Sequence, residues 1–594
     1  MLARSILVIS LLLLSACNST IKNTHIDKNQ TLDVNHGVVG VQVINNSDAL
    51  AVNHKGWTEV IVVRLDNMEV RKQQAIDKAK EKKNYSIDQP RFDWKPDFYS
   101  LTPTQEGLID SQIFIGSMPD GRYMISSLYS FYNGGDYTSW LTMPVDVMAG
   151  IFTVKKGQLT NLGSIVFQPL LNVQEKSFWS QQSSKKAYVT RLNTLRAIDS
   201  FLFTHYPNLA NSLNLDNVLT WEKDTLDSFR SELSTLSRQN AYGKTAMPLS
   251  IHGKSVIASK FGQLKWQDKQ DKWHQVNLAT NSQLAAILET EDMIMVAGER
   301  GEIFTAKDWQ QAWTPVSRVP ATEAIIWFGA GKSSYYAMTQ SSNEYSAYKF
   351  SSLASDWQKL TSFQRNTNNF LTVIGNVFPI ITKSGQLSVL NDKKLFQHDL
   401  ITDTWKEIRT DSMLAIASLP TGDLAGVEVS QWDGIGDQVI SQNSGESWIS
   451  INRYLKSFAD GEAEKSVPLM LADGTVLTLG REGLKSTNGK RASSELKIIS
   501  THISTANDKK SWQYHGFAKS DCETLLAQIS SKEELYFLCD KGDIVFTKDF
   551  GMTWQYVIDI EIADMQFKYN QLIEAIKVEN SKEAKLSSTR LNEY

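Results

Sequence analysis

Gly542-Asp-Ile-Val-Phe-Thr-Lys-Asp-Phe-Gly-Met-Thr-Trp554 is the stretch that decides the fold, because its pattern recurs elsewhere in the chain. A glycine, an Asp or Asn, and a tryptophan return twice more at the same offsets. These two copies are Gly436, Asn443 and Trp448, and Gly301, Asp308 and Trp313. A pattern that repeats at fixed spacing indicates an array of small similar units in the second half of the protein.

Short apolar runs separate the residues that close each unit. The closing positions are Trp273, Trp313, Trp357, Trp405, Trp448, Leu496 and Trp554. About four short strands per unit of about 45 residues is the pattern of a β-propeller blade. We therefore predict a mainly β protein with a seven-bladed propeller over 246–580, six or eight blades being the alternatives, and a C-terminal tail at 581–594. The first unit shows one strand too few, so we expect the apolar segment Met565 to Ile576 to complete the first blade and close the ring.

Two copies of the repeat fit a tighter motif, Ser/Thr-x-Asp/Asn-x-Gly-x-x-Trp. Its residues are Ser441, Asn443, Gly445 and Trp448 in one copy, and Thr547, Asp549, Gly551 and Trp554 in the other. In a tight turn the Asp or Asn bonds backbone amides, the glycine accepts a positive φ, and the tryptophan packs against the sheet. The motif resembles the Asp-box, or bacterial neuraminidase repeat, of sialidases, sortilin-type receptors and photosystem II assembly factors. That resemblance implies a structural role on the rim, away from the ligand face, and we favour it over a metal site at Asp549 or Asn443.

The first seventeen residues predict where the protein resides. Arg4 is followed by a short apolar run and then by Leu14-Ser15-Ala16-Cys17, as in a secretory signal peptide. This ending resembles the lipobox of bacterial lipoproteins, which implies a signal peptide over 1–17 and lipidation, including palmitate, on Cys17. Asn18 then implies the outer membrane, on its periplasmic or surface face, and 18–36 would form a tether. An ordinary signal peptide or a short anchor is the alternative.

Two further cysteines, Cys522 and Cys539, lie on either side of a predicted hairpin. Its turn is Ser530 to Glu533, and the index sum of the two cysteines lies within two of the sum for the turn, so they could face each other across it. Because an exported protein meets an oxidising compartment, we predict a disulfide. Two buried free thiols are the alternative, and no His or Cys stands nearby at zinc-ligand spacing.

The chain before the propeller is predicted as two parts. Residues 37–172 alternate as β-strands do, and their spacing resembles the transthyretin-like or carboxypeptidase-regulatory-like β-sandwich modules of envelope proteins. Arg71 to Lys83 interrupts this domain as an exposed helix. Residues 173–245 are expected to be a short helical connector, in which one apolar stripe packs in the core rather than serving as a partner groove. The stripe is Leu226, Phe229, Leu233 and Leu236.

Catalytic and cofactor patterns are weak. The formal net charge of −4 offers no basic field for nucleic acid. A sialidase resemblance would imply an arginine triad and a Tyr-Glu pair, yet the Phe/Tyr-Arg-Ile-Pro opening is missing, and Ser317 to Pro320 is the nearest fragment. Gly331-Lys332-Ser333 lacks the first glycine of a phosphate-binding loop and reads as a hairpin turn. We therefore assign no catalytic, metal or cofactor residue.

These observations favour a lipid-anchored envelope protein whose propeller is a non-enzymatic scaffold for a protein partner. The photosystem-factor resemblance implies an assembly role of this kind. A glycan-binding or sialidase-like glycosidase propeller is the alternative from another class, and a surface adhesin is a third.

Overall fold

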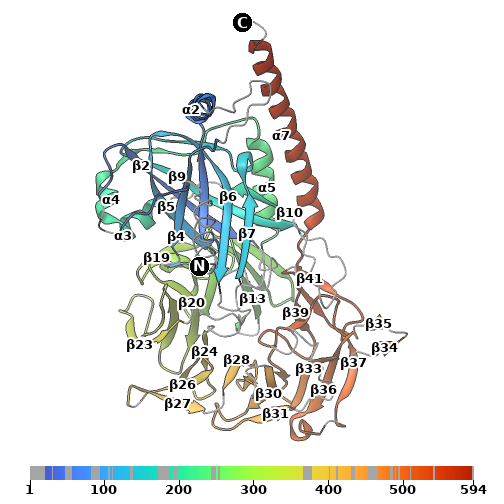
Figure 1. Ribbon diagram of the computed structural model, residues 1–594. Helices are drawn as coiled ribbons and strands as arrows, with labels where there is room; N and C mark the ends of the chain where they lie inside the picture. The colour runs from blue at the N-terminus through green and yellow to red at the C-terminus, as the bar shows by residue number, and fades with distance from the viewer. Residues whose placement is uncertain are drawn as a thin grey trace, which may run out of the picture.

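The computed structural model describes most of the chain from residue 21 to residue 591. It leaves out 28, 30, 47–55, 82–93, 105–106, 110, 134–137, 171–185, 193–196, 242–248, 252–253, 366–376, 401, 410–411, 430–434, 452–465, 482–485, 488–489, 492–494, 509 and 540–541. Figure 1 shows a β domain stacked on a ring of small sheets, with a long C-terminal helix that starts at the ring and runs beside the β domain. None of the helices in the described part of the chain has the length and apolar character to cross a bilayer.

The N-terminal domain is one sheet that folds over itself, with strand order β10-β9-β2-β5-β4-β3-β6-β7 and with β1, β8 and β11 attached to β4, β6 and β9. The fold occurs at β4, which pairs with β3 through Leu101 and with β5 from Thr102 onward. The strands are β1 (Ile21–Asn23), β2 (His36–Asn45), β3 (Glu59–Arg64), β4 (Phe98–Thr104), β5 (Ser111–Pro119), β6 (Gly121–Asn133), β7 (Thr138–Pro144), β8 (Ile151–Val154), β9 (Gln158–Leu170), β10 (Lys186–Arg191) and β11 (Asn214–Leu219).

The two halves of this sheet enclose a common apolar core. Alternate residues of β2 (Val39, Val41 and Val43) pack against β6 and β8 on the facing half, as the period of two in a strand requires. The opposite face of β2 is also buried, because Val38 packs against Ile198 of α3. The helices of this domain are α2 (Met68–Lys80), η2 (Asp146–Met148), α3 (Ala197–His205), α4 (Pro207–Ser212) and α5 (Asp227–Gln239).

The structure shifts the bounds of the helix expected over 71–83, and it adds two strands to the helical connector expected over 173–245. Helix α2 covers Met68–Lys80 and buries only Ala79, as an exposed helix should. The connector region contains α3, α4 and α5, but it also supplies β10 and β11, which pair with β9. Sequence patterning missed these strands because β11 is largely exposed and lacks the alternation that marks a half-buried strand.

The predicted seven-bladed propeller is confirmed: seven four-stranded antiparallel sheets follow one another along the chain. Blades 1 to 3 contain β12 (Leu249–Ile251), β13 (Lys254–Ala258), β14 (Gln263–Gln267) and β15 (Trp273–Asn277); β16 (Leu284–Glu289), β17 (Ile294–Gly298), β18 (Glu302–Ala306) and β19 (Thr314–Ser317); and β20 (Ala324–Ala330), β21 (Tyr335–Gln340), β22 (Glu344–Phe350) and β23 (Gln358–Gln364), with the short helix η3 (Glu299–Gly301) in blade 2.

Blades 4 to 7 continue in the same way. They contain β24 (Val377–Ile381), β25 (Leu387–Asn391), β26 (Lys394–Asp399) and β27 (Thr404–Arg409); β28 (Met413–Ser418), β29 (Leu424–Val429), β30 (Ile435–Ser441) and β31 (Ile449–Ile451); β32 (Leu469–Met470), β33 (Thr475–Arg481), β36 (Leu496–His502) and β37 (Gln513–Phe517); and β38 (Thr524–Leu525), β39 (Leu535–Leu538), β40 (Ile544–Thr547) and β41 (Gln555–Ile558). Blade 6 also carries the hairpin of β34 (Ser486–Thr487) and β35 (Lys490–Arg491) and the short helix η4 (Ile503–Thr505).

One closing position was predicted incorrectly. Leu496 begins β36, the third strand of blade 6, and the fourth strand β37 starts after Trp512. Trp512 therefore occupies the place that Trp554 holds before β41 and packs against the cluster shared by blades 5 to 7. The segment that carries β34 and β35 lengthens blade 6 and shifted the expected spacing.

The predicted ring closure was also wrong. Blade 1 has its own first strand, β12, which at three residues is too short to read as an apolar run. The segment Met565 to Ile576 is not a strand but lies within α7 (Ile562–Leu591), a helix of 30 residues. No strand is exchanged between blades 1 and 7 in the sheet order, so other contacts must join the ends of the ring.

Side chains and helices make that junction. Lys265 Nζ of blade 1 donates to the carbonyl oxygen of Val557 in blade 7 at 2.6 Å, and the rings of Trp273 and Tyr536 meet edge to face. Helix α7 then crosses back to α5, where Met565 and Leu572 are fully buried with Leu233. The C-terminal helix thus fastens the ring by packing, where a shared strand was expected.

Candidate functional site

The domain above the ring rests on one face of the propeller (Figure 1). Glu299, 1% exposed in the η3 turn of blade 2, accepts hydrogen bonds from the N–H of Ile109 at 3.0 Å and from the hydroxyl of Ser111 at 2.9 Å. The Arg300 N–H donates to the carbonyl oxygen of Gly107 at 2.6 Å. Buried charged hydrogen bonds of this kind hold two surfaces in one register.

Further contacts extend this interface to neighbouring blades. Gln340 of blade 3 donates to the carbonyl oxygen of Leu108 at 3.0 Å, Asn281 between blades 1 and 2 donates to Ser164 at 3.3 Å, and the N–H of Glu561 after blade 7 donates to Asn240 at 2.6 Å. All of these propeller residues lie in turns between second and third strands or between blades, or at their edges. In an antiparallel blade such turns share one face. The N-terminal domain therefore sits on that face, over blades 7, 1, 2 and 3.

The motif residues of blades 5 and 7 lie between third and fourth strands, and so on the opposite face. In blade 7 the Gly551 N–H donates to Thr547 Oγ1 at 2.8 Å, and the Thr553 N–H and hydroxyl donate to the Asp549 carboxylate at 2.8 and 2.6 Å. The Trp554 indole donates to the Gly551 carbonyl oxygen at 3.1 Å. These hydrogen bonds lower the pKa of Asp549 to about 2.

The blade 5 copy has the same bonds with an amide in place of the carboxylate. Asn443 Oδ1 accepts from the Ser447 N–H at 2.9 Å, while its Nδ2 donates to the Ser447 hydroxyl at 2.8 Å. The Gly445 N–H donates to Ser441 Oγ, and the Trp448 indole donates to the Gly445 carbonyl oxygen. Each polar group of the motif is therefore satisfied inside its own turn, and no group of three or more metal-ligating side chains occurs among the described residues.

The copy of the repeat in blade 2, with Asp308 and Trp313, lacks the glycine of the tighter motif and so shows what this glycine contributes. Gly445 and Gly551 adopt φ of 95° and 94°, whereas Gln310 in the matching position does not adopt a positive φ. Asp308 still accepts from the backbone N–H of Gln310 and Gln311. The Trp313 indole, however, finds no acceptor within the described part of the chain. A side chain that disfavours the left-handed conformation thus removes the carbonyl that the tryptophan would bond.

Cys522 and Cys539 form the predicted disulfide. They flank the two-residue pairing of β38 with β39, where Thr524 lies opposite Leu538. Both cysteines are buried in the core shared by blades 5 to 7. The bond therefore pins the inner hairpin of the last blade. Cys17, the predicted lipidation site, lies outside the described residues.

The first strands of the seven blades are almost free of charged residues. They are β12, β16, β20, β24, β28, β32 and β38, and Glu289 at the end of β16 is their one ionisable residue. Four of the propeller arginines have described side chains, and each is bound locally: Arg300 to Glu302, Arg318 to the Leu353 carbonyl oxygen, Arg365 to the Ser341 carbonyl oxygen, and Arg409 to Glu428 and the Trp448 ring. These four do not form a carboxylate clamp.

Two Tyr-Glu pairs escaped the sequence analysis, because their members come together only through strand pairing or burial. The Tyr348 hydroxyl donates to Glu323 at 3.1 Å, and the Tyr536 hydroxyl donates to Glu534 at 2.5 Å. Burial is the main cause that raises the pKa of both phenols, and the adjacent carboxylates raise it further. Tyr348 and Tyr536 are both buried, and the two pairs form buried hydrogen bonds within blades 3 and 7.

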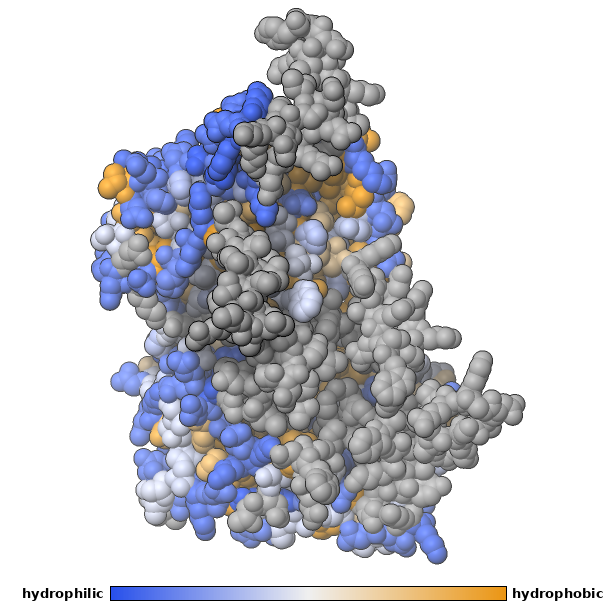
Figure 2. All heavy atoms as spheres, in the orientation of Figure 1, coloured by the Kyte–Doolittle hydropathy of each residue, from blue (hydrophilic) through white to orange (hydrophobic). Residues whose placement is uncertain are grey.

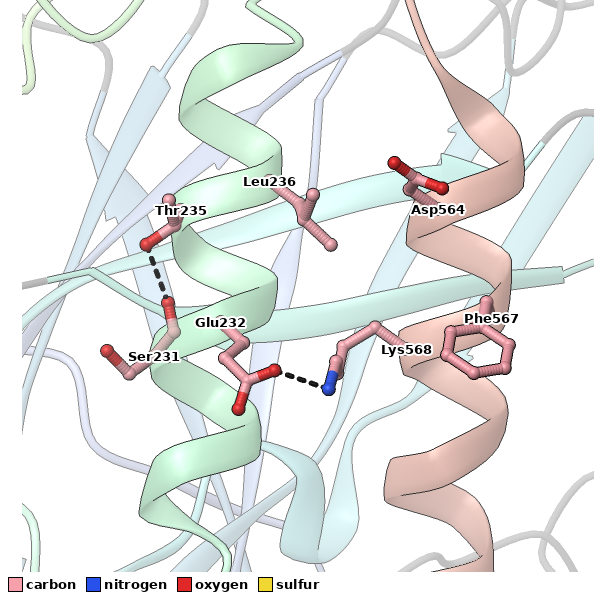
Figure 3. A pocket seen from close by; sticks show the side chains of 7 residues that line it. All are labelled: Ser231, Glu232, Thr235, Leu236, Asp564, Phe567 and Lys568. Atoms are coloured by element: carbon pink, nitrogen blue, oxygen red, sulfur yellow. Dashed lines mark hydrogen bonds and ion pairs between the residues drawn. The ribbon is translucent and has the colours of Figure 1, made fainter.

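A groove of about 380 Å³ lies between α5 and α7. Figure 3 shows Leu236 of α5 between the two helices and the ion pair of Glu232 with Lys568 across them. Phe567 on α7 is 64% exposed beside it, and Figure 2 shows apolar side chains gathered over this part of the surface. The remaining lining residues are Ser231, Thr235 and Asp564. This mixture suits contact with a protein surface better than chemistry on a small substrate.

No family model matches the sequence, and no curated protein matches it. Among solved structures the chain is similar to YCF48 bound to D1 peptide (14% identity, TM-score 0.33, 52% of this chain and 94% of that one). It is also similar to YCF48 from Cyanidioschyzon merolae (11% identity, TM-score 0.29, 48% of this chain and 88% of that one) and to a puromycin-hydrolyzing peptidase of Mycobacterium tuberculosis (10% identity, TM-score 0.36, 54% of each chain). These scores are too low to carry an argument about function.

Proposed function

We propose that the protein is a lipid-anchored component of a bacterial cell envelope, located in the outer membrane, whose propeller serves as a non-enzymatic scaffold for a protein partner. The observation that carries this proposal is the character of the first strands. The first strands of the seven blades contain one ionisable residue, Glu289, while the described arginines and Tyr-Glu pairs of the propeller are bound within their own structural contacts. A ring whose described side chains contain no converging charged set is suited to presenting its loops to another protein.

The location of the N-terminal domain restricts the part of the propeller that a protein partner can contact. Its hydrogen bonds come from blades 1, 2 and 3 and from the chain after blade 7. On the same face of blade 4, the turn between β25 and β26 carries the exposed Asp392, and we infer that a partner contacts this turn. The motif turns on the opposite face then act as rim structures, in keeping with the resemblance to Asp-box propellers.

The anchor is tested by metabolic labelling with an alkyne-bearing palmitate. We expect the wild-type chain to carry the label and to fractionate with outer membranes, and Cys17→Ala to lose both properties. A wild-type chain without label would overturn the anchor.

The non-enzymatic role is tested with a fluorogenic sialoside and a glycan array. We expect neither hydrolysis nor binding, and we expect the same protein partner in repeated affinity purifications of the intact chain from envelope extracts. Hydrolysis of the sialoside would replace the scaffold by the glycosidase alternative.

A further inference from the structure

In the part of the chain that the structure describes, one end of the N-terminal sheet has no neighbouring strand on its outer side. At the other end, β10 packs against α5, where the Thr190 hydroxyl donates to the Arg230 carbonyl oxygen at 2.8 Å. Strand β7 ends the sheet order on the opposite side, and among the described residues β6 is its only partner strand. A terminal strand exposes a row of backbone donors and acceptors, which proteins usually protect with charges, prolines or bulges.

The register shows which backbone groups of β7 point outward. Val145 N–H donates to the Ser126 carbonyl oxygen, so hydrogen-bonded pairs with β6 recur every second residue, at Leu141 and Met143. The carbonyl of Tyr129, opposite Thr142, instead accepts from Thr58 on the β3 side of β6. The N–H and C=O groups of Trp140 and Thr142 therefore point away from the sheet.

The side chains make this edge unusual. Strand β7 reads Thr-Ser-Trp-Leu-Thr-Met-Pro and has no charged residue, and its only proline is the last. Leu141 and Met143 pack against the core and fix the register. Trp140 lies directly opposite Phe131 on the solvent side, and these rings are 71% and 47% exposed. The edge thus offers backbone groups next to an uncovered aromatic pair.

We propose that β7 binds an extended segment of a partner protein, which adds to the sheet as a further strand beside Trp140 and Thr142. Free backbone N–H and C=O groups are recognised by another extended backbone, and the aromatic pair selects a large apolar side chain on the added strand. This site lies on the N-terminal domain and does not rest on the propeller function proposed above.

A partner segment fits better than a second copy of the chain. The seven residues of β7 span about 23 Å at about 3.3 Å per residue. Two such edges meeting across a symmetry axis would offer three outward N–H groups each, at Thr138, Trp140 and Thr142, and would bury less than the roughly 1,200 Å² of a stable dimer. A single flexible strand can follow the edge and close over Trp140 without the rest of a folded domain.

The test uses random dodecapeptides displayed on phage, selected on the intact chain and then made as soluble peptides. We expect Thr142→Pro to weaken binding by roughly tenfold or more, because it removes an outward N–H and places a ring on the edge. Since this N–H is not in the β6 ladder, Thr142→Pro should keep its melting temperature. Leu141→Pro is the matched control and should lower the melting temperature, because its N–H pairs with β6.

The decisive measurement methylates the backbone nitrogens of a selected peptide one at a time. A peptide bound as a strand loses affinity at every second position and tolerates methylation in between, whatever happens to the protein variants. Loss at all positions or at none, failure to select any peptide, or oligosaccharide binding that needs Trp140 but not the Thr142 N–H would overturn the proposal. Self-association that disappears in Thr142→Pro would assign the edge to a second copy and overturn it as well.

Discussion

At the scale of single residues, the motif turns of blades 5 and 7 use the same backbone hydrogen bonds, accepted by an amide in one and by a carboxylate in the other. Asp549 and Asn443 accept from the matching backbone N–H groups at 2.8 and 2.9 Å. The carboxylate, however, has a pKa of about 2, below its ordinary value of 3.8. A carboxyl group with a depressed folded pKa stabilises the protein above the unfolded pKa, and this stabilisation is lost as the pH falls from there toward 2.

Asp549→Asn should therefore remove the pH dependence of stability that comes from Asp549. It should keep the fold, because Asn443 shows that an amide fits this turn. We expect the difference in melting temperature between wild type and Asp549→Asn to shrink as the pH is lowered from about 5 to about 2. Asp549→Ala should be less stable than Asp549→Asn at neutral pH, where it loses the acceptor itself. A melting-temperature difference that does not change with pH would contradict the assignment.

Gly551 is the second residue on which the blade 7 turn depends. Its φ is 94°, and a Cβ there would meet the Phe517 carbonyl oxygen at 2.0 Å. Gly551→Ala should lower the free energy of unfolding by roughly 1–3 kcal/mol or more, from strain and collision together. Gly157→Ala is the control, because Gly157 also has a positive φ but its Cβ would meet nothing within 4 Å. If Gly551→Ala and Gly157→Ala lower the free energy of unfolding by the same amount in urea denaturation, the collision of the new Cβ with the Phe517 carbonyl oxygen is relieved in the variant.

At the scale of elements, the ends of the ring are held together by the packing of α7 and not by a shared strand. Met565 and Leu572 are fully buried against α5 and blade 7. Leu572→Ala should cost about 2–5 kcal/mol of unfolding free energy, as buried leucines do, whereas the exposed Phe567→Ala should stay within about 0.5 kcal/mol. Chemical denaturation measures both, and a similar cost for the two would show that the helix does not close the ring.

The disulfide belongs to the last blade. It joins residues separated by 17 positions, and removal of a link that closes a loop of this size should cost about 3 kcal/mol. The double variant Cys522→Ala/Cys539→Ala should thus unfold earlier than wild type in urea, and a reducing agent should lower the wild-type midpoint but not that of the variant.

The elements also show how far the sequence could predict this fold. The repeated Gly, Asp or Asn and Trp spacing predicted the blades, because each part of the turn has a fixed conformational task. It could not predict β12, whose three residues carry no periodic pattern, or the fourth-strand tryptophan of blade 6, which an insertion displaces. Met565 to Ile576 is apolar enough for a strand or a helix, and only its contacts with α5 decide for the helix.

At the scale of the whole molecule, the N-terminal domain and the propeller should behave as one unit. Glu299 is the buried residue that links them, because it accepts hydrogen bonds from the Ile109 N–H and the Ser111 hydroxyl. Glu299→Ala leaves those donors buried without an acceptor, at a cost of about 3 kcal/mol, and we expect calorimetry to resolve two transitions where wild type gives one. A single unchanged transition would mean that the remaining contacts between the N-terminal domain and the propeller are enough to couple their unfolding.

The candidate site was only partly accessible to sequence reasoning. The disulfide was predicted from the spacing of Cys522 and Cys539 around one turn. The groove between α5 and α7 was not, because the two helices are distant in sequence, and the Tyr348–Glu323 pair was not, because its members meet only when the strands of blade 3 pair. The outward backbone groups of Trp140 depend on strand order, which no local pattern contains.

Site-specific photo-crosslinking in the envelope tests the scaffold proposal most directly. A photoreactive residue is placed either at Asp392, on the propeller face that the N-terminal domain shares, or at the exposed Glu446, in the motif turn of the opposite face. The scaffold account predicts one reproducible protein adduct from position 392 and none from position 446. An adduct from 446 alone, or the absence of any adduct from 392, would contradict it.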